Sequence, residues 1–437
     1  MRHRLLAIIL LIILSSGCSL IRGDENEIEP TPTPDLPTPV ATPTLIPTAD
    51  ATEPAISKPP TDLNIWIIPE LAPDAEDPGS QLLADQLSSF AASHPDLNLN
   101  IEVKATGGQG GTLNYLRTGR DVAPTILPDL IIIGSDQLSA AAAEELIFPI
   151  DSFLNQEMLD DLYSAAMSLS RVGELIYGYP YFLTNFQHVA YNSIVLDAPL
   201  PETWDELVDM EDASFVFPAG GPDGAELALQ FYLASGGQLA DDANQPLLEV
   251  DPLTAALNYL SRGRNLGAIA PSSQNITTLS QAWEFYSNSI ANIVQTEAPI
   301  LLTERTAGDE STFSPIPGPT DSMYPLIKGW LWAVSTPDPV RQALAIELLS
   351  WLASGPNMGE WSSESGQLPS RKSAFDSWPA GDDYTDYLRS QLDFARPFPK
   401  GASNTVMSAL SEAVFDVISQ TKSPRLAAED AAALLEQ

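Results

Sequence analysis

The chain has 437 residues, with 20 Lys plus Arg against 58 Asp plus Glu, which gives a formal net charge of −38. An acidic excess of this size argues against nucleic acid or an anionic membrane surface as a partner, because like charges repel. A single cysteine excludes an internal disulfide, and with only three histidines the chain cannot assemble a zinc site of clustered Cys and His.

The amino end has the parts of an export signal. Basic residues at 2–4 precede an apolar run at 5–14, which is too short to span a bilayer. Small residues before the single Cys18 resemble a bacterial lipobox, although Ser15 stands where such boxes usually carry Leu. The resemblance implies that residues 1–17 are a signal peptide and that Cys18 is lipidated. An ordinary signal with an incidental cysteine is the alternative.

Residues 18–61 have the composition of a spacer. The stretch EPTPTPDLPTPVATPTLIPT places Pro at every second or third position and shows no apolar period. Such a segment favours extended, polyproline-like conformations of about 3 Å per residue. We interpret it as a disordered tether behind Cys18, with an O-glycosylated stalk or a docking ligand as alternatives.

The remaining chain, about 375 residues, is too long for one hydrophobic core, so two lobes are expected. Its first part alternates strand and helix patterns. Apolar runs predict strands at 63–68, 99–103 and 130–133, and helical spacing predicts helices at 82–93 and 138–145. This order indicates a parallel sheet wrapped by helices.

Parallel sheets bind ligands at the carboxyl ends of their strands. That rule places Trp66, the glycine-rich turn at 107–111 and the pair Ser135-Asp136 along one rim of the predicted sheet. The turn is not a phosphate loop, because no Gly-Lys-Ser/Thr follows it. Asp136 is either an acceptor for solute hydroxyls or the cap of the following helix.

The second half of the chain mixes helices with two further strands. Thr203 stands where a helix cap is expected. Trp330 and Trp332 lie two residues apart on one of the strands, so both rings point to the same face. The predicted elements are helices at 204–210, 225–234, 254–262, 341–352 and 408–418 and strands at 290–294 and 327–334.

The sequence offers little for catalysis. It contains no Gly-x-Ser-x-Gly elbow, no His-Glu-x-x-His helix and no calcium loop of regularly spaced acids. Carboxylates are abundant, and two of them a few ångströms apart in a cleft would suffice to hydrolyse a glycoside. Sequence spacing leaves that possibility open.

Several stretches occur in order along nearly all of the folded part. They are PDLIIIGSDQL with EELIFPID, ELIYGYPYFLTNFQHVAYNS, PETWDEL, STFSPIPGP, KGWLWAVS with AIELLSWLAS, and SGQLPSRKSAF, followed by a helix that bears SEAVFDVI. Together they resemble the extracellular solute-binding proteins of bacterial ABC importers, in the large group that mostly carries sugars. None is diagnostic alone, whereas YGYPY…YN, PETWDEL and LPSR in this order are specific together.

The resemblance implies a type II periplasmic-binding fold of the α/β class, in which a hinge joins two α/β lobes and the ligand cleft lies between them. It assigns residues 62–182 plus 318–352 to lobe 1 and residues 183–317 plus 353–437 to lobe 2. In the family, the stretch that matches GYPYFLTNFQHVAYN is where the chain first passes from one lobe to the other, along the floor of the cleft.

The residues of this stretch suit a neutral, polyhydroxylated solute. Aromatic faces stack on the apolar faces of sugar rings, and amides such as those of Asn185 and Gln187 pair with hydroxyls as donor and acceptor. Tyr179 and Tyr191 are interpreted as core residues, and packing in the core is the alternative for each aromatic candidate. The predicted ligand-binding residues are Trp66, Asp136, Phe182, Asn185, Phe186, Trp330, Trp332 and Trp361.

The resemblance implies a monomeric, lipid-anchored receptor on the outer face of the cell membrane. It would capture a carbohydrate, deliver it to the transmembrane subunits of an ABC permease, and use no cofactor or metal. Alternatives are a surface glycoside hydrolase and a sensory or adhesive module on the same fold. A receptor for ferric ion, held by Tyr179 and Tyr181, is a further alternative.

Overall fold

The computed structural model describes residues 60–122, 126–196, 199–243, 245–305 and 311–436. The predicted signal peptide, the lipidation site at Cys18 and the tether up to residue 59 lie outside these described residues. Within the described ranges, no helix is long and apolar enough to cross a membrane.

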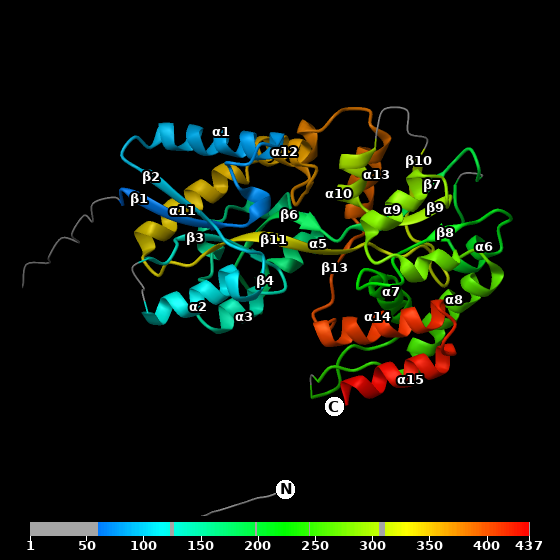
Figure 1. Ribbon diagram of the computed structural model, residues 1–437. Coiled ribbons are helices and arrows are strands. Elements are labelled where there is room, and N and C mark those ends of the chain that lie inside the picture. Colours follow the sequence, from blue (N-terminus) through cyan, green and yellow to red (C-terminus); the bar gives the residue numbers. More distant parts are fainter. Residues whose placement is uncertain (1–59, 123–125, 197–198, 244, 306–310, 437) are drawn as a thin grey trace, which may run out of the picture. The chain divides into compact units, whose positions relative to one another are not determined.

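A mixed sheet dominates the first half of the fold (Figure 1). Strands β1, β2 and β3 pair in parallel, as the alternation of strand and helix predicts, whereas β11 runs antiparallel between β3 and β6. Seven strands of the described residues belong to this sheet: β12 (Leu368–Pro369), β6 (Tyr179–Thr184), β11 (Leu326–Val334), β3 (Leu130–Gly134), β1 (Asp62–Ile67), β2 (Asn98–Val103) and, paired with β11, β13 (Arg396–Pro397).

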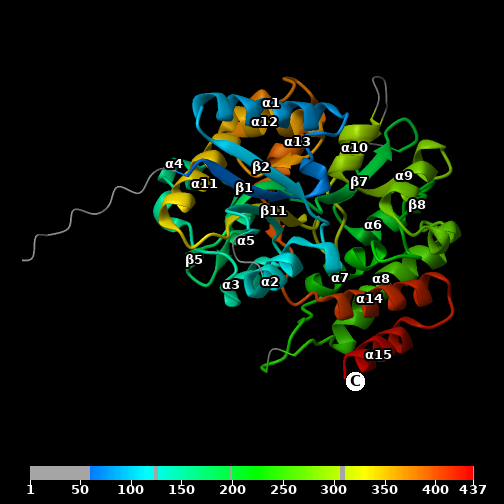
Figure 2. The same cartoon turned by 60° about the vertical axis from the view of Figure 1, so that its left-hand side comes forward.

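Helices cover both faces of this first sheet (Figures 1 and 2). One face packs its aliphatic side chains against α1, α11 and α12, and the other packs Trp66, Ile131 and Ile133 against α2 and α3. Because both faces are buried, the central strands are nearly continuous apolar runs. The helices of this half are α1 (Pro78–Ser93), α2 (Thr112–Val122), α3 (Leu138–Ala143), α4 (Gln156–Asp160), α5 (Ser164–Leu169), α11 (Pro339–Leu352) and α12 (Gly355–Ser365).

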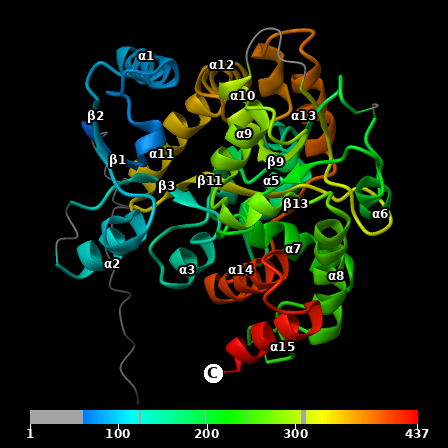
Figure 3. The ribbon, with the colours of Figure 1, turned by 45° about the vertical axis from the view of Figure 1, so that its right-hand side comes forward.

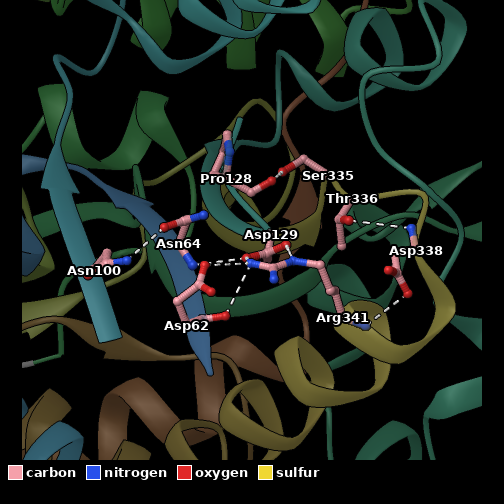
Figure 4. A network of polar contacts seen from close by, with 9 residues as sticks. All are labelled: Asp62, Asn64, Asn100, Pro128, Asp129, Ser335, Thr336, Asp338 and Arg341. Atoms are coloured by element: carbon pink, nitrogen blue, oxygen red, sulfur yellow. Dashed lines mark hydrogen bonds and ion pairs between the residues drawn. The ribbon is translucent and has the colours of Figure 1, made fainter. Parts of the chain in front are cut away.

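A buried ion pair fastens the elements of the first sheet to each other (Figure 4). Asp129, 2% exposed, accepts two hydrogen bonds of 2.6 Å from the Arg341 guanidinium on α11 and one of 2.9 Å from the backbone N–H of Asn64 on β1. Arg341 also reaches the Asp62 carboxylate at 3.2 Å. These hydrogen bonds raise the pKa of Arg341, so the guanidinium stays charged.

A second sheet, of four strands within the described residues, carries the other hydrophobic cores. Strand β7 pairs antiparallel with both β10 and β9, and β8 pairs with β9 in parallel. The strands are β10 (Ser311–Ser314), β7 (Gln187–Asn192), β9 (Ile293–Glu297) and β8 (Phe215–Val216), and a separate small hairpin joins β4 (Arg171–Val172) to β5 (Leu175–Ile176).

The second sheet is also covered on both faces. One face packs on α7 and α8, beside which α14 and α15 lie (Figure 3), and the other packs on α9 and α13. The helices are α6 (Trp204–Val208), α7 (Gly224–Ala234), α8 (Val250–Leu266), α9 (Leu279–Ser287), α10 (Ala298–Glu304), α13 (Asp383–Leu392), α14 (Asn404–Ile418) and α15 (Pro424–Leu435). The predicted cap is confirmed, because the Thr203 hydroxyl accepts from the Glu206 backbone N–H at the start of α6.

A sheet with helices on both of its faces, a three-layered α/β/α architecture, is therefore present twice. Helix α12 and strand β12 follow residue 353, yet they lie with the first sheet, because α12 packs on α1 and β12 pairs with β6. The residue boundaries given above for the two lobes stay a prediction.

Candidate functional site

The chain passes from the first sheet to the second in two residues, between the end of β6 at Thr184 and the start of β7 at Gln187. Asn185 makes the turn with φ of 67°, in the left-handed region that Asn tolerates better than most residues. Its side-chain Nδ2 donates a 3.0 Å hydrogen bond to the carbonyl of Leu326, where β11 begins. Asn185 therefore ties one crossing segment to another.

Strand β11 enters the first sheet at the same place. Lys328 pairs with Thr184 and Trp330 pairs with Phe182, before a bulge that follows Trp330. Lys328 and Trp330 are two residues apart on a regular stretch of strand, so their side chains leave the same face. Both are only partly buried.

Amides and carboxylates meet beside this junction. Gln187 donates from Nε2 to Glu226 Oε2 at 2.6 Å and accepts at Oε1 from Gln295 Nε2, also at 2.6 Å. Lys328 Nζ lies 3.4 Å from Glu226 Oε1. We name this group the crossing cluster, and it comprises Asn185, Gln187, Asp223, Glu226, Gln295, Glu297 and Lys328.

Three different elements position the carboxylates of the crossing cluster. Glu226 lies in the first turn of α7 and Asp223 is the residue just before that helix, where acidic side chains are favoured by the helix dipole. Glu297 ends β9 and is the direct cross-strand neighbour of Gln187 on β7. Neighbours across an antiparallel pair share a face, so Glu297 lies on the side of the sheet that packs against α7.

The cluster perturbs the protonation of its acids. Burial raises the pKa of Glu226, and Lys328 opposes that rise. Burial, followed by the negative charges of Asp223 and Glu226, raises the pKa of Glu297 to about 7. Raised pKa values of this kind occur where carboxylates are held together without enough positive charge.

A cavity of about 520 Å³ adjoins the start of β11. Leu326, Arg396 and Gln230 line it, and Gln230 stands one helical turn after Glu226 on α7. The Nε2 of Gln230 is buried and has no hydrogen-bond partner within the described residues. A larger hollow of about 660 Å³ lies between His94 and Glu347, and neither of these two cavities is lined by a residue of the crossing cluster.

The arrangement suits recognition of hydroxyl and amino groups. Carboxylates and amide oxygens accept hydrogen bonds, amide and ammonium groups donate them, and the half-buried indole of Trp330 offers an apolar face. Metal binding has no such support, since the described ranges contain no group of three or more His, Cys, Asp or Glu side chains that could hold an ion.

The structure brings three of the predicted ligand-binding residues to this junction. Asn185 belongs to the crossing cluster, and Trp330 follows Lys328 on β11. Asp136 is exposed, and a Cβ placed on Gly134 would meet its Oδ1 at 2.5 Å and the Trp330 ring at 3.8 Å. The alternative role of Asp136 as a helix cap is wrong, because α3 begins after Gln137 and has no side-chain cap.

The other predicted ligand-binding residues are buried. Phe182, Trp332 and Trp361 lie in the core between the first sheet and its helices, where Trp361 stacks on Tyr181 at 4.7 Å. Phe186 is fully buried under the second sheet. None of these four rings exposes more than 2% of its surface. Their contact with a solute stays a prediction.

Trp66 lies on the opposite face of the first sheet from Trp330. It is 4% exposed and contacts Tyr115 edge to face at 6.1 Å. The Lys104 ammonium lies 4.5 Å from the Trp66 ring and 4.6 Å from the Tyr115 ring, a cation–π arrangement. Tyr179 and Tyr191 are buried core residues, as predicted.

Sequence reasoning missed the charged members of the crossing cluster. Asp223, Glu226, Glu297 and Lys328 are far apart in sequence and lie on separate elements. The available signal was weak: Asp223-Gly224 precedes a predicted helix, and Glu297 follows the strand predicted at 290–294 and stands two residues before Pro299.

Comparison with known proteins assigns the chain to a family. The family model described as bacterial extracellular solute-binding protein matches residues 86–388, which is more than half of the chain. The chain belongs to this family. Its members are binding proteins of ABC importers, and they are not enzymes.

Solved structures confirm the fold of this solute-binding protein. Maltose-bound MalE3 of T. maritima has a TM-score of 0.65 at 16% identity, over 86% of this chain and 99% of that one. The sugar-binding protein MalE of Xanthomonas citri has a TM-score of 0.70 at 15% identity, over 86% and 97%. The GacH receptor of Streptomyces glaucescens, solved with acarbose, has a TM-score of 0.62 at 16% identity, over 86% and 98%.

No curated protein matches this solute-binding protein. The predicted α/β periplasmic-binding fold is confirmed by the structural likeness, and the predicted family by the family match. Membership places this solute-binding protein outside the cytoplasm and gives it a small-molecule solute. A glycoside hydrolase does not fit this membership, because the family consists of binding proteins.

Proposed function

We propose that this protein is the saccharide receptor of an ABC importer, which captures a mono- or oligosaccharide at the junction of its two sheets and delivers it to the permease. The observation that carries the proposal is the position of Trp330. Its half-buried ring leaves β11 from the same face as Lys328, two residues away, and Lys328 reaches the Glu226 carboxylate of the crossing cluster.

Saccharide rings present apolar C–H faces and a rim of hydroxyls. An indole stacks on the former, and charged or amide acceptors bind the latter. The exposed carboxylate of Asp136 offers a further acceptor, since its Oδ1 and the Trp330 ring both lie within 4 Å of the position that a Cβ on Gly134 would take. The saccharides named for the similar structures, among them maltose and mannotriose, are consistent with this chemistry.

The proposal includes the place of the receptor in the cell. The basic and apolar amino end, Cys18 and the Pro-Thr segment support a lipid anchor at Cys18 and a tether that follows it. The lipid anchor is tested by growing the bacterium that makes the protein in the presence of a labelled fatty-acid analogue. Label should enter the wild-type chain and be absent from a Cys18→Ser variant.

Isothermal titration calorimetry with a panel of neutral and substituted mono- to tetrasaccharides tests the saccharide proposal. At least one saccharide should bind, and Trp330→Ala should weaken that binding roughly tenfold or more, the equivalent of about 1.4 kcal/mol. The control is Trp351→Phe, because Trp351 is 40% exposed on α11 and lies outside the crossing cluster. Binding of another class of solute with no response to any saccharide would overturn the proposal.

A further inference from the structure

The crossing cluster contains three acidic side chains and one basic side chain. Asp223, Glu226 and Glu297 act on each other as like charges, and Lys328 is the cation that acts on them. The Lys328 ammonium is already engaged, since it lies 3.4 Å from a Glu226 oxygen and 3.9 Å from the centre of the Phe398 ring. One ammonium therefore serves three carboxylates.

Glu297 is the carboxylate of the cluster that has no hydrogen-bond donor or cation bound to it among the described residues. Its side chain is partly exposed and makes no hydrogen bond or salt bridge with any described residue. Its cross-strand neighbour Gln187 uses its amide on other partners, since Nε2 donates to Glu226 and Oε1 accepts from Gln295. Asp223, in contrast, accepts from the backbone N–H of Leu279 at 3.1 Å.

Gln295 provides an independent sign that a donor belongs here. It stands two residues before Glu297 on β9, so both side chains lie on the face that carries Gln187. Gln295 is fully buried, and its Oε1 has no hydrogen-bond donor among the described residues. A buried acceptor without a donor costs about 1–3 kcal/mol, so its persistence beside an open carboxylate indicates a site for a donor-rich group.

We propose that the solute carries a protonated amine, and that the ammonium is received by Glu297. The inference rests on the function proposed above and specifies the solute as an aminated saccharide. A hydroxyl can donate one hydrogen bond to the open acceptors but brings no charge. An ammonium brings three N–H donors and one positive charge. The donors suit the acceptor oxygens of Gln295 and Glu297, and the charge balances the excess of carboxylates in the cluster.

A cationic solute couples binding to pH in a defined direction. The charged groups that act on Glu297 are Asp223 and Glu226 near α7 and Lys328 on β11, and Tyr384 on α13 lies on the other side of the sheet. An ammonium stabilises the ionised form of Glu297, whose pKa in the free protein is about 7. Binding of the amine therefore releases a proton near pH 7, and affinity falls as the pH drops from 8 to 6.

Matched saccharides provide the test. Glucose, maltose and maltotriose are compared by calorimetry with forms in which one C6 hydroxyl is replaced by an amino group or by its N-acetyl derivative. The C6 amine is an alkyl amine, so like a lysine side chain it stays protonated at pH 8. Titrations in two buffers of different ionisation enthalpy measure the proton released on binding. The variants are Glu297→Gln and, as control, Glu304→Gln, because Glu304 is exposed at the end of α10.

The expected result is that an amino form binds at least tenfold more tightly than its hydroxyl and N-acetyl forms at pH 8. This preference should disappear in Glu297→Gln and persist in Glu304→Gln. Equal or tighter binding of the neutral forms by the wild-type protein would overturn the amine proposal and leave the saccharide proposal intact. A preference for the amine that survives in Glu297→Gln would overturn the assignment to Glu297. Absence of binding for all three forms would count against the saccharide proposal itself.

Discussion

Glu297 shows how one side chain can set the pH dependence of stability. A carboxyl whose pKa rises from 4.5 in the unfolded chain to about 7 in the folded protein holds its proton more tightly when folded. The stability that it contributes is therefore fully present below pH 4.5 and is lost as the pH rises through 7. The charge that appears is repelled by Asp223 and Glu226.

We expect Glu297→Gln to raise the free energy of unfolding by roughly 2–3 kcal/mol at pH 8 and by much less at pH 5, because Gln resembles the protonated carboxyl. Denaturant unfolding of both proteins at the two pH values measures this. Burial lowers the pKa of His188 to about 3, so its contribution to the stability of the protein is lost as the pH falls below 6.5. This contribution is the same in both proteins and cancels when their free energies of unfolding are compared.

Glu304→Gln is the matched control for this measurement, because an exposed carboxyl of α10 should change stability by less than about 0.5 kcal/mol at either pH. If Glu297→Gln had the same effect at pH 5 and pH 8, the carboxyl would not titrate in this range. The electrostatic account of the crossing cluster would then be wrong.

At the scale of elements, one ion pair holds β1, β3 and α11 together. Asp129 precedes β3 and uses its carboxylate for both Arg341 and the backbone of Asn64, while its own N–H donates to the Asn64 carbonyl at 2.8 Å. Removing one partner of a buried pair leaves the other charge without compensation.

Asp129→Asn keeps the size of the side chain and removes its charge, so we expect a loss of about 3 kcal/mol in the free energy of unfolding. Asp376→Asn is the control, since Asp376 and Arg389 form an ion pair at 3.0 Å with side chains that are 73% and 43% exposed. That exposed pair should contribute less than about 1 kcal/mol. Equal losses in the two variants, measured by denaturant unfolding, would contradict the importance of burial here.

The elements that the sequence predicts well are those with one simple pattern. β3 is a continuous apolar run, and β1 and β11 are largely apolar, because both faces of their sheet are covered. α7 begins within one residue of its predicted start. α12 was not predicted, since Gly355 and Pro356 look like a break although they occupy its first turn. Pro is well tolerated there because the first N–H groups of a helix have no partner within it.

The crossing strands are harder to predict for a physical reason. In β6, every residue from Tyr179 to Leu183 is buried, so apolar side chains do not alternate with polar ones. Aromatic residues in such a stretch look the same whether they face a solute or a neighbouring helix. The crossing cluster is invisible for another reason: Glu226 and Glu297 meet only because α7 packs on the face of β9 that carries Glu297.

At the scale of the whole molecule, a solute bound at the crossing segments should change the arrangement of the two sheets with their helices. A ligand that contacts both halves only when they approach shifts the population toward the closed form. The links are short, as the two residues between β6 and β7 show, so the motion should be a rigid-body rotation of the halves about these links.

We therefore expect the radius of gyration in small-angle X-ray scattering to decrease when a bound saccharide is added to saturation. The net charge of −38 makes molecules repel each other, so the measurement needs about 0.15 M salt, where the Debye length is about 8 Å. Trp330→Ala with the same saccharide concentration should show a smaller decrease, because a smaller fraction of the variant is bound. Binding detected by calorimetry without any decrease in the wild-type radius would show that capture needs no closure, because the site would then be complete in the open form.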